Sequence, residues 1–475
     1  MMKFFGVSLG QYRKIVVFSL LTLVSACALN PITGIFGGGD DDEEEKENAS
    51  DEDERISILA LDEQLTVDPR YAGASVEIPP SYVNASWSQP GGEADHTLHH
   101  LSAPLDMKVV WKTDIGSASS RRARLTSPPI VVNDRVYVMD AAARVSSLDA
   151  ETGERIWRTV LTPKIKEHFR FRDILRGPKP AQIGFGGGVA FDQGRIFVTS
   201  GFGFVAALDA DTGEEIWRFK TSAAVRTPPT AYRGFVFFTT NTNEFVALNQ
   251  ETGKKEWTFQ SFEETARFLS SSSPAAAGDL VVAPFSSGEL VAFIADSGRA
   301  VWNETLMRQT RLTALSSLND IAGSPVIDRG LVFVVSHGGR LVAIDIRTGR
   351  AVWEASVASL QMPWVAGDYL FVVTVDSELA CISREDGGII WVTQLKRYKK
   401  EKKKKKKGRI TWAGPVLAGD HLVLVSSNKE IVKVSPLTGE VVSTVKIGGS
   451  SVVAPIVAGE KLYILTEEGK LIAMR

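Results

Sequence analysis

Residues 340–353 read RLVAIDIRTGRAVW, and variants of this stretch recur along most of the chain. In the variants an apolar segment leads into a polar turn, a glycine follows, and a tryptophan usually stands in the next segment. Seven variants occur, with turn glycines Gly153, Gly213, Gly253, Gly298, Gly349, Gly387 and Gly439. Self-similarity at spacings of 38 to 60 residues indicates an architecture built from repeated units.

Each copy predicts a β-hairpin. Leu341–Ile344 form an apolar strand, and the Asp345 carboxylate can accept hydrogen bonds from the backbone N–H groups that come after it. Gly349 supplies the positive φ that closes the turn. Trp353 lies in the second strand, where its large ring can pack against the neighbouring unit.

A second signature precedes the hairpins and consists of a strand, an Asp/Gly turn and another strand. It begins at Ser127, Gly187, Pro228, Ser273, Ser324, Met362, Gly414 and Ala454. Together the two signatures give four antiparallel strands per unit, which is the blade of a β-propeller. The sequence therefore predicts an all-β protein with eight four-stranded blades.

The two ends of the repeat region are complementary. The eighth unit stops at Arg475 after its third strand, whereas Val109–Lys112 form a strand with no unit of its own. We expect this N-terminal strand to complete the last blade and close the ring, because closure removes an exposed sheet edge. The predicted propeller domain is 107–475.

Composition limits the classes of function. The 475 residues include 44% hydrophobic and 23% charged residues, so the chain can bury a large core. A net charge of -2 does not indicate a nucleic-acid partner. The two cysteines cannot form a disulfide framework or a cysteine-rich zinc site, and Cys381 is expected to be a buried, inert thiol.

The N-terminus resembles a lipoprotein signal peptide spanning 1–26. Basic residues precede the apolar run Ile15–Ala26, which is too short to span a bilayer comfortably. The run ends in Val24–Cys27, which resembles a bacterial lipobox and implies acylation of Cys27. The following Ala28 implies sorting to the outer membrane. The alternative is a short N-terminal anchor with a buried cysteine.

An acidic tether is predicted over 27–60. The segment Asp40–Glu54 contains eleven acidic residues in fifteen, which repel one another and have nothing to bury. We expect an extended, disordered linker here, followed by an N-terminal extended segment over 61–106.

The repeat pattern Ala-Leu-Asp-x-x-Thr-Gly-x-x-x-Trp resembles that of PQQ-type eight-bladed propellers, and with the lipobox it resembles the BamB family of outer-membrane lipoproteins. The resemblance covers 107–475. It implies a non-enzymatic scaffold without cofactor, facing the periplasm of a Gram-negative bacterium. Its partners would be the POTRA domains of a BamA-like barrel protein, the outer membrane through Cys27, and unfolded outer-membrane proteins, whose folding and insertion it would assist; no nucleic acid is implied.

The same resemblance places the partner-binding residues in two loops. The family carries Leu-Ser-Leu-Arg in the first loop, where this chain has Arg267, Phe268 and Leu269 in a shifted order. In the second loop, Arg311 and Asp320 are the expected contacts. Asp320 matches the first position of the family's Asp-x-Asp, whereas Ala322 departs from the second.

The alternative is a membrane-tethered PQQ-dependent oxidoreductase. Such an enzyme requires Ca²⁺ held by oxygen ligands, a catalytic carboxylate and aromatic faces for the quinone. Many enzymes of this class also carry a vicinal cysteine pair, which this sequence lacks. The repeated aspartates are assigned to turns and the repeated tryptophans to blade packing, so the pattern supplies no catalytic constellation.

Three polar segments remain. His96, His99 and His100 could bind zinc but lack defined metal-ligand spacing, which favours a solvated or strand-capping role. Lys402–Lys407 is expected to be a solvated loop, with anionic lipid or the acidic tether as alternative contacts. Thr162–Gln182 is a basic insertion that could bind a partner or cover a blade edge.

Overall fold

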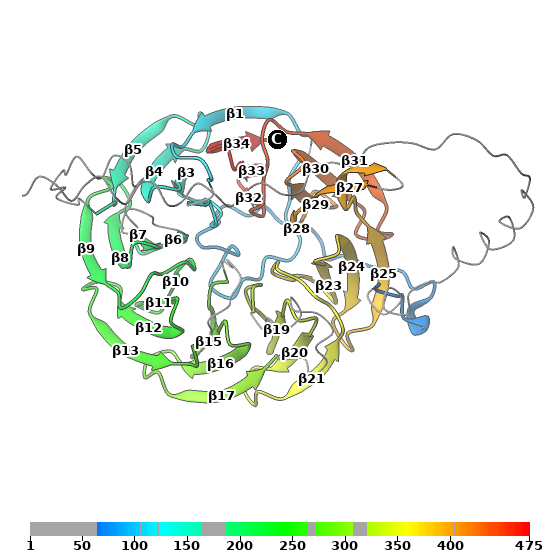
Figure 1. The fold of residues 1–475 in the computed structure, drawn as a ribbon, viewed down its shortest axis with the longest axis horizontal. Coiled ribbons are helices and arrows are strands. Elements are labelled where there is room, and N and C mark those ends of the chain that lie inside the picture. The colour runs from blue at the N-terminus through cyan, green and yellow to red at the C-terminus, as the bar shows by residue number, and fades with distance from the viewer. Residues whose placement is uncertain are drawn as a thin grey trace, which may run out of the picture. The chain divides into compact units, whose positions relative to one another are not determined.

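The computed structural model describes residues 64–104, 106–120, 123–163, 186–263, 272–306, 321–402 and 405–475. The chain divides into two compact units between Gln64 and Leu65, and the second unit spans residues 65–475. This second unit is a ring of eight four-stranded antiparallel sheets (Figure 1), as the repeats predict. No helix within the described ranges has the length and apolarity needed to cross a membrane.

The blades are numbered in chain order from the innermost strand outward. Blades 1 to 4 comprise β2 (Ile130–Val132), β3 (Arg135–Met139), β4 (Arg144–Asp149), β5 (Arg155–Val160); β6 (Gly187–Asp192), β7 (Arg195–Ser200), β8 (Phe204–Asp209), β9 (Glu215–Lys220); β10 (Thr230–Tyr232), β11 (Phe235–Thr239), β12 (Glu244–Asn249), β13 (Lys255–Gln260); β14 (Ala275–Ala277), β15 (Leu280–Pro284), β16 (Glu289–Ile294), β17 (Ala300–Thr305).

Blades 5 to 8 comprise β18 (Val326–Asp328), β19 (Leu331–Val335), β20 (Leu341–Asp345), β21 (Ala351–Ala355); β22 (Trp364–Ala366), β23 (Tyr369–Val373), β24 (Glu378–Ser383), β25 (Ile389–Gln394); β28 (Trp412–Ala418), β29 (His421–Ser426), β30 (Glu430–Val434), β31 (Val441–Lys446); β32 (Ile456–Ala458), β33 (Lys461–Leu465), β34 (Lys470–Met474), β1 (Val109–Asp114). Outside the blades lie the short helix η1 (Pro69–Tyr71) and the hairpin β26 (Tyr398–Lys402) with β27 (Lys405–Arg409).

The closing strand is confirmed. β1 pairs antiparallel with β34, with Trp111 opposite Ala473 and Lys112 opposite Ile472. The backbones of Lys108 and Arg475 exchange two hydrogen bonds of 2.9 Å beyond this pairing. The N-terminal strand therefore becomes the outermost strand of blade 8, and no third strand of that blade is left as an edge.

The repeated tryptophans lock each blade to the next. Trp157 of blade 1 donates from Nε1 to the Ala210 carbonyl of blade 2 at 3.0 Å. Its ring covers Gly213, where an added Cβ would lie 2.5 Å from the ring at a φ of +76°. The same pairing joins the tryptophans to the turn glycines at Trp111–Gly153, Trp157–Gly213, Trp217–Gly253, Trp257–Gly298, Trp302–Gly349, Trp353–Gly387 and Trp391–Gly439.

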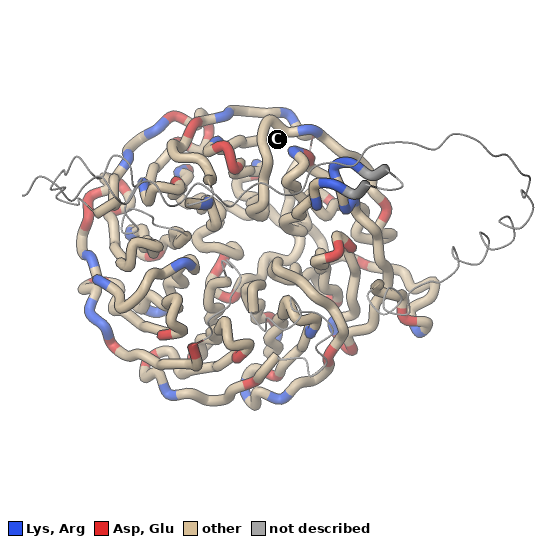
Figure 2. The backbone as a smooth tube through the Cα atoms, viewed as in Figure 1, with Lys and Arg blue, Asp and Glu red and all other residues tan. Residues whose placement is uncertain are grey.

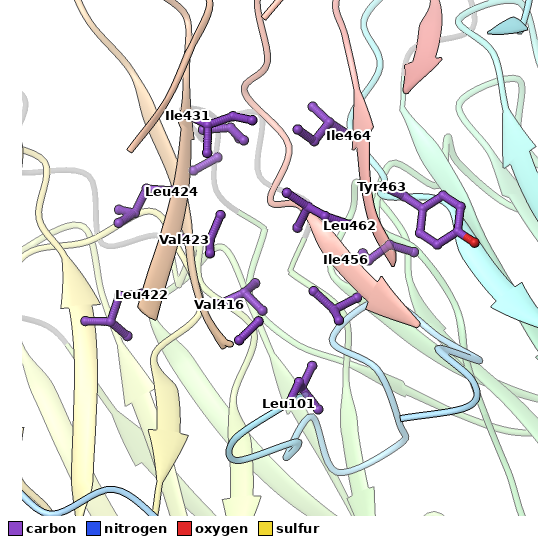
Figure 3. Packing of buried hydrophobic residues seen from close by; sticks show 14 of the residues in the cluster. Leu101, Val416, Leu422, Val423, Leu424, Ile431, Ile456, Leu462, Tyr463 and Ile464 are labelled. Atoms are coloured by element: carbon purple, nitrogen blue, oxygen red, sulfur yellow. The ribbon is translucent and has the colours of Figure 1, made fainter. Parts of the chain in front are cut away.

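The eighth junction, between blades 7 and 8, is built differently. The position equivalent to the tryptophans is Ser443, opposite Lys433 in the ladder. Blade 8 has no β-hairpin at its outer edge, because its last two strands come from opposite chain ends, so there is no turn glycine to receive a ring. Aliphatic side chains of the two blades meet at this junction instead, among them Val423 and Ile431 of blade 7 and Leu462 and Ile464 of blade 8 (Figure 3).

The turn aspartates are structural, as the repeat indicates. The Asp345 carboxylate accepts hydrogen bonds from the backbone N–H groups of Arg347 and Thr348 and from the Thr348 hydroxyl, at 2.9 to 3.1 Å. These bonds lower the pKa of Asp345 below its usual value. Cys381 is fully buried in β24, and burial raises the pKa of its thiol, so the expectation of an inert buried cysteine is confirmed.

An unexpected element runs inside the ring. Residues 82–102, called the belt here, pass along the innermost strands (Figure 1) and touch all eight blades in order. The belt residues that hydrogen-bond blades 8, 1, 2, 3, 4, 5, 6 and 7 are, in turn, Asn84, Trp87, Ser88, Gln89, Ala94, Asp95, His99 and Leu101. The belt then closes on itself, since Tyr82 N–H donates to His100 and Ser102 N–H donates to Tyr82.

The three histidines belong to this belt. His96 and His100 are buried, and His99 is partly buried, so the expectation of solvation does not hold for the first two. His100 donates from Nδ1 to the Pro79 carbonyl at 2.7 Å and accepts at Nε2 from the Asp420 N–H. The imidazoles thus fasten the belt to different blades, and they form no common cluster.

Candidate interaction face

Five long connections join blades on one side of the ring. Every blade has the same strand order, so each connection from an outermost strand to the next innermost strand emerges on the same face. The long ones on this interblade face are 115–129, 161–186, 261–274, 306–325 and 395–411. Short hairpin turns, including the Asp–Gly turns, occupy the opposite face at the outer strands. Loops on a rigid scaffold commonly carry binding residues.

The residues expected to bind a partner belong to two of these connections. Arg267, Phe268 and Leu269 fall in 261–274, and Arg311 and Asp320 fall in 306–325. All five lie outside the described residues, as do Cys27, Asp40–Glu54 and most of Thr162–Gln182. Their contacts therefore stay predictions. The structure describes only the residues that flank them at the ends of the two connections.

The flanking residues bring the ends of the two connections together. Ser272 Oγ donates to the Gly323 carbonyl at 3.3 Å, and the Ser273 N–H donates to Ser324 Oγ at 2.9 Å. His96 of the belt joins both, because its Nδ1 lies 2.7 Å from the Pro325 carbonyl and its Nε2 lies 3.3 Å from Ser273 Oγ. The roots of both predicted docking loops thus form one hydrogen-bonded unit.

The other end of the first connection is also fixed. Ser261 Oγ donates to the Glu289 carboxylate, and Asn243 Nδ2 donates to the Phe262 carbonyl at 2.5 Å. Burial alone would raise the pKa of Glu289, but hydrogen bonds from Ser261, Asn303 and Ser287 keep it below its usual value. Glu289 therefore stays ionised near neutral pH and continues to accept from the loop root.

Phe262 is a candidate contact that the sequence reasoning missed. Its side chain is 77% exposed immediately before the undescribed part of the connection. Aromatic side chains are enriched at protein interfaces, so an exposed phenylalanine in this connection is available for a partner contact. The signal available in the sequence was a phenylalanine placed between Ser261 and Glu263 in an interblade connection.

A hollow of about 120 Å³ lies where the innermost strands and the belt meet. Trp87 and Trp364 stack in its wall with ring centroids 6.4 Å apart. The remaining wall is Pro90, Gly91, Thr126, Pro128, Ala322, Ser324, Leu360, Gln361, Met362, Gly414, Pro415, Val416, Val452, Val453, Ala454, Pro455 and Ile456.

This wall does not fit a calcium–quinone centre. It contains no Asp, Glu, Lys, Arg or His, whereas Ca²⁺ takes carboxylate ligands and a quinone enzyme needs a catalytic carboxylate. Within the described ranges, no three His, Cys, Asp or Glu side chains converge as metal ligands would. The described wall of this hollow therefore lacks the carboxylates that a calcium–quinone centre requires.

Comparison with known protein families agrees with the fold. The model of the family described as "Outer membrane protein assembly factor BamB" matches residues 92–175, 141–393 and 395–475. The curated BamB of Salmonella typhimurium is 27% identical over 367 residues, which is 77% of this chain and 88% of that protein. The BamB of Burkholderia pseudomallei is 26% identical over 382 residues, 80% and 90% of the two chains.

Solved structures give the same architecture. The crystal structure of BamB from Moraxella catarrhalis matches with a TM-score of 0.62 at 17% identity, over 78% of this chain and 99% of that one. A europium-containing methanol dehydrogenase also matches with a TM-score of 0.62, at 15% identity, over 80% and 89%. At these identities the likeness shows the fold alone, and the same fold serves both assembly factors and enzymes.

Proposed function

Because the chain belongs to the family described as outer membrane protein assembly factor BamB, we propose that it is a non-enzymatic periplasmic scaffold of the β-barrel assembly machinery. It docks on the POTRA domains of a BamA-like barrel protein and assists the folding and insertion of outer-membrane proteins. The observation that carries this proposal is the family match across the whole propeller. The uncharged wall of the central hollow supports a scaffold over a quinone enzyme.

The docking site is proposed on the interblade face, at the connections 261–274 and 306–325. The hydrogen bonds from Ser272 and Ser273 to the end of the second connection support a single site made from both loops. Phe262, Phe268 and Leu269 supply apolar anchors, while Arg267 and Arg311 donate charge-assisted hydrogen bonds. Asp320 contacts the partner or orders its own loop.

The double variant Arg267→Glu, Phe268→Ala is expected to reduce co-purification of the barrel protein at least tenfold. Loss of one anchor and reversal of one charge in an interface together remove a few kcal/mol of binding free energy. The measurement is the amount of barrel protein recovered with the affinity-tagged chain from solubilised membranes.

The matched control is Arg347→Glu, which reverses an exposed arginine in a turn on the opposite face. It should leave recovery unchanged. Equal recovery for the double variant and the wild type would reject the site, whereas a wild type that recovers no barrel component would reject the function itself. Phe262→Ala, read in the same assay, should fall between the control and the double variant.

We also propose that Cys27 anchors the protein to the outer membrane by its acyl chains, because stable attachment follows when one residue carries two or three chains. Cys27→Ser is expected to abolish labelling by a clickable palmitate analogue and to move the protein out of the outer-membrane fraction. Cys381→Ala is the control, since this thiol is fully buried, and it should keep full labelling. Retained label in Cys27→Ser would refute the anchor.

A further inference from the structure

The connection between blades 6 and 7 carries the strongest local charge in the chain. Residues 396–409 contain eleven Lys and Arg residues and one glutamate, a formal net charge of +10. Lys402–Lys407 within this stretch are expected to form a solvated loop, whereas the described residues on either side of 403–404 belong to two paired strands, β26 and β27, that add to no blade sheet. Figure 2 shows the basic residues gathered on this hairpin beside blade 7.

Blade 6 holds the hairpin at its root. Arg397 Nε donates to the Asp376 carbonyl at 2.8 Å, and Arg409 Nη2 donates to the Asp376 carboxylate at 2.9 Å and to the Val375 carbonyl at 2.6 Å. The Ile410 N–H donates to the Arg397 carbonyl at 2.8 Å, which continues the pairing to the base. The two arginines are thus engaged at the root, whereas the described lysines beyond them, Lys399, Lys400 and Lys407, are exposed.

The pairing register places like charges opposite one another. Lys400 faces Lys407, and Lys402 faces Lys405. Directly opposed like charges destabilise a ladder, and a lone two-stranded hairpin is marginal in water. The side chains of Lys399, Lys400 and Lys407 are exposed and have no ion-pair partner within the described residues. A polyanion bound along the hairpin would remove this repulsion.

The chain itself supplies a polyanion of matching size. Asp40–Glu54 contains eleven acidic residues and one lysine, a formal net charge of -10 over fifteen residues. Residues 396–409, which comprise the hairpin and its root, carry +10 over fourteen residues. Two segments of this length and opposite charge can neutralise each other almost residue for residue, and no other segment of comparable negative charge density occurs in the sequence.

The start of the propeller lies at the hairpin root. The Leu65 N–H bonds to the Glu378 carboxylate, which is 3.9 Å from Arg397 Nη2, and the Asp68 N–H donates to the Ile389 carbonyl at 2.8 Å. Ten residues, 55–64, separate the acidic segment from this point and span at most about 35 Å when extended. A five-residue strand measures about 17 Å, so the linker allows the acidic segment to reach the whole hairpin.

We propose that the hairpin β26–β27 is a docking site for the acidic segment Asp40–Glu54 of the same chain. The bound segment screens the lysines from other anions, such as the phosphates of lipid headgroups. The contact is electrostatic and close to the surface, so it weakens as salt rises. This inference does not depend on the proposed function.

The test is zero-length crosslinking of the full-length protein in neutral detergent. A carbodiimide joins a carboxylate to a lysine amine with loss of water only where the two groups touch, and mass spectrometry identifies the pairs. Crosslinks from 40–54 should concentrate on Lys399–Lys407 at 20 mM salt and fall at least fivefold at 0.5 M salt. The triple variant Lys399→Gln, Lys400→Gln, Lys407→Gln should reduce them at least threefold.

The matched control is Lys220→Gln, Lys254→Gln, Lys255→Gln, which removes the same charge from exposed positions in blades 2 and 3. It should leave the crosslinks intact. Crosslinks spread evenly over surface lysines would overturn the proposal, as would crosslinks formed only between a ¹⁵N-labelled and an unlabelled copy.

A second measurement separates the tether from a lipid surface. Sedimentation of the Cys27→Ser protein, which lacks the acyl anchor, with phosphatidylglycerol vesicles should show at least tenfold tighter binding after further deletion of residues 40–54, because the lysines are then uncovered. Cys27→Ser protein with an intact 40–54 segment that binds these vesicles as tightly as the deletion variant would show that lipid is the occupant, and the proposal would be wrong.

Discussion

Deletion of residues 28–113 is expected to prevent formation of a stable ring. The deletion removes β1, which leaves β34 as an open edge, and it removes the belt, which hydrogen-bonds every innermost strand. We expect aggregated protein or a chain without a cooperative unfolding transition, measured by circular dichroism during heating. Deletion of residues 28–54 alone removes neither feature and should melt as the wild type does.

A point variant in β1 tests ring closure without removing the belt. Trp111 is 8% exposed, and its Nε1 donates to the Ala150 carbonyl of blade 1 at 3.0 Å. Trp111→Ala is expected to lower the free energy of unfolding by about 3–5 kcal/mol, because loss of a large buried aromatic leaves a cavity and removes its hydrogen bond to the Ala150 carbonyl.

The control on the same strand is Val110→Ala. Val110 is 44% exposed and should change stability by less than about 1 kcal/mol. Urea titrations of both variants give the comparison. Equal midpoints for Trp111→Ala and Val110→Ala would contradict the role of β1 as a closing strand, and so would a 28–113 deletion that melts like the 28–54 deletion.

Acid is expected to weaken the fold through His96. Burial lowers the pKa of this imidazole from 6.5 to about 4, even though the Pro325 carbonyl favours the protonated form. Between pH 6.5 and pH 4 the unfolded chain takes up a proton that the folded chain excludes, so stability falls as the pH falls. A pKa difference of this size between the unfolded and the folded state corresponds to a loss of about 3 kcal/mol in the free energy of unfolding below pH 4.

The variant His96→Asn should remove the part of the pH dependence of stability that His96 causes. Asparagine tolerates the positive φ of 65° at this position, so the backbone need not change. The variant is expected to be less stable than the wild type at pH 7.5, because the bonds to Pro325 and Ser273 are weakened, and the gap should narrow at pH 4.5. Urea titrations at the two pH values measure the difference in unfolding free energy between wild type and variant. A difference that is the same at both pH values would show that folded His96 does not exclude the proton.

The sequence alone determined the repeating part of the molecule. A hairpin turn such as Asp345 to Gly349 needs only hydrogen bonds within five residues and one residue at positive φ, so it can be recognised locally. The tryptophan and glycine recur together because each ring packs on the turn of the next blade. The number of units along the sequence also indicates that the last blade lacks one strand, which β1 supplies. Ser443 agrees with this relation, because the junction between blades 7 and 8 has neither a turn glycine nor a tryptophan to pack on it.

Only the tertiary structure decided the paths of the segments between and before the repeats. The belt has no periodic pattern, and its bonds join residues far apart in sequence: Gln89 pairs with Ala231, 142 positions away. His96 became buried, rather than solvated, because the belt carries it under Ser273 and Pro325. Likewise, Arg397 and Arg409, at the base of the paired strands β26 and β27, are held by contacts to blade 6 that the sequence does not indicate. Local propensity carries no information about such partners, since they are brought together only when the ring has closed.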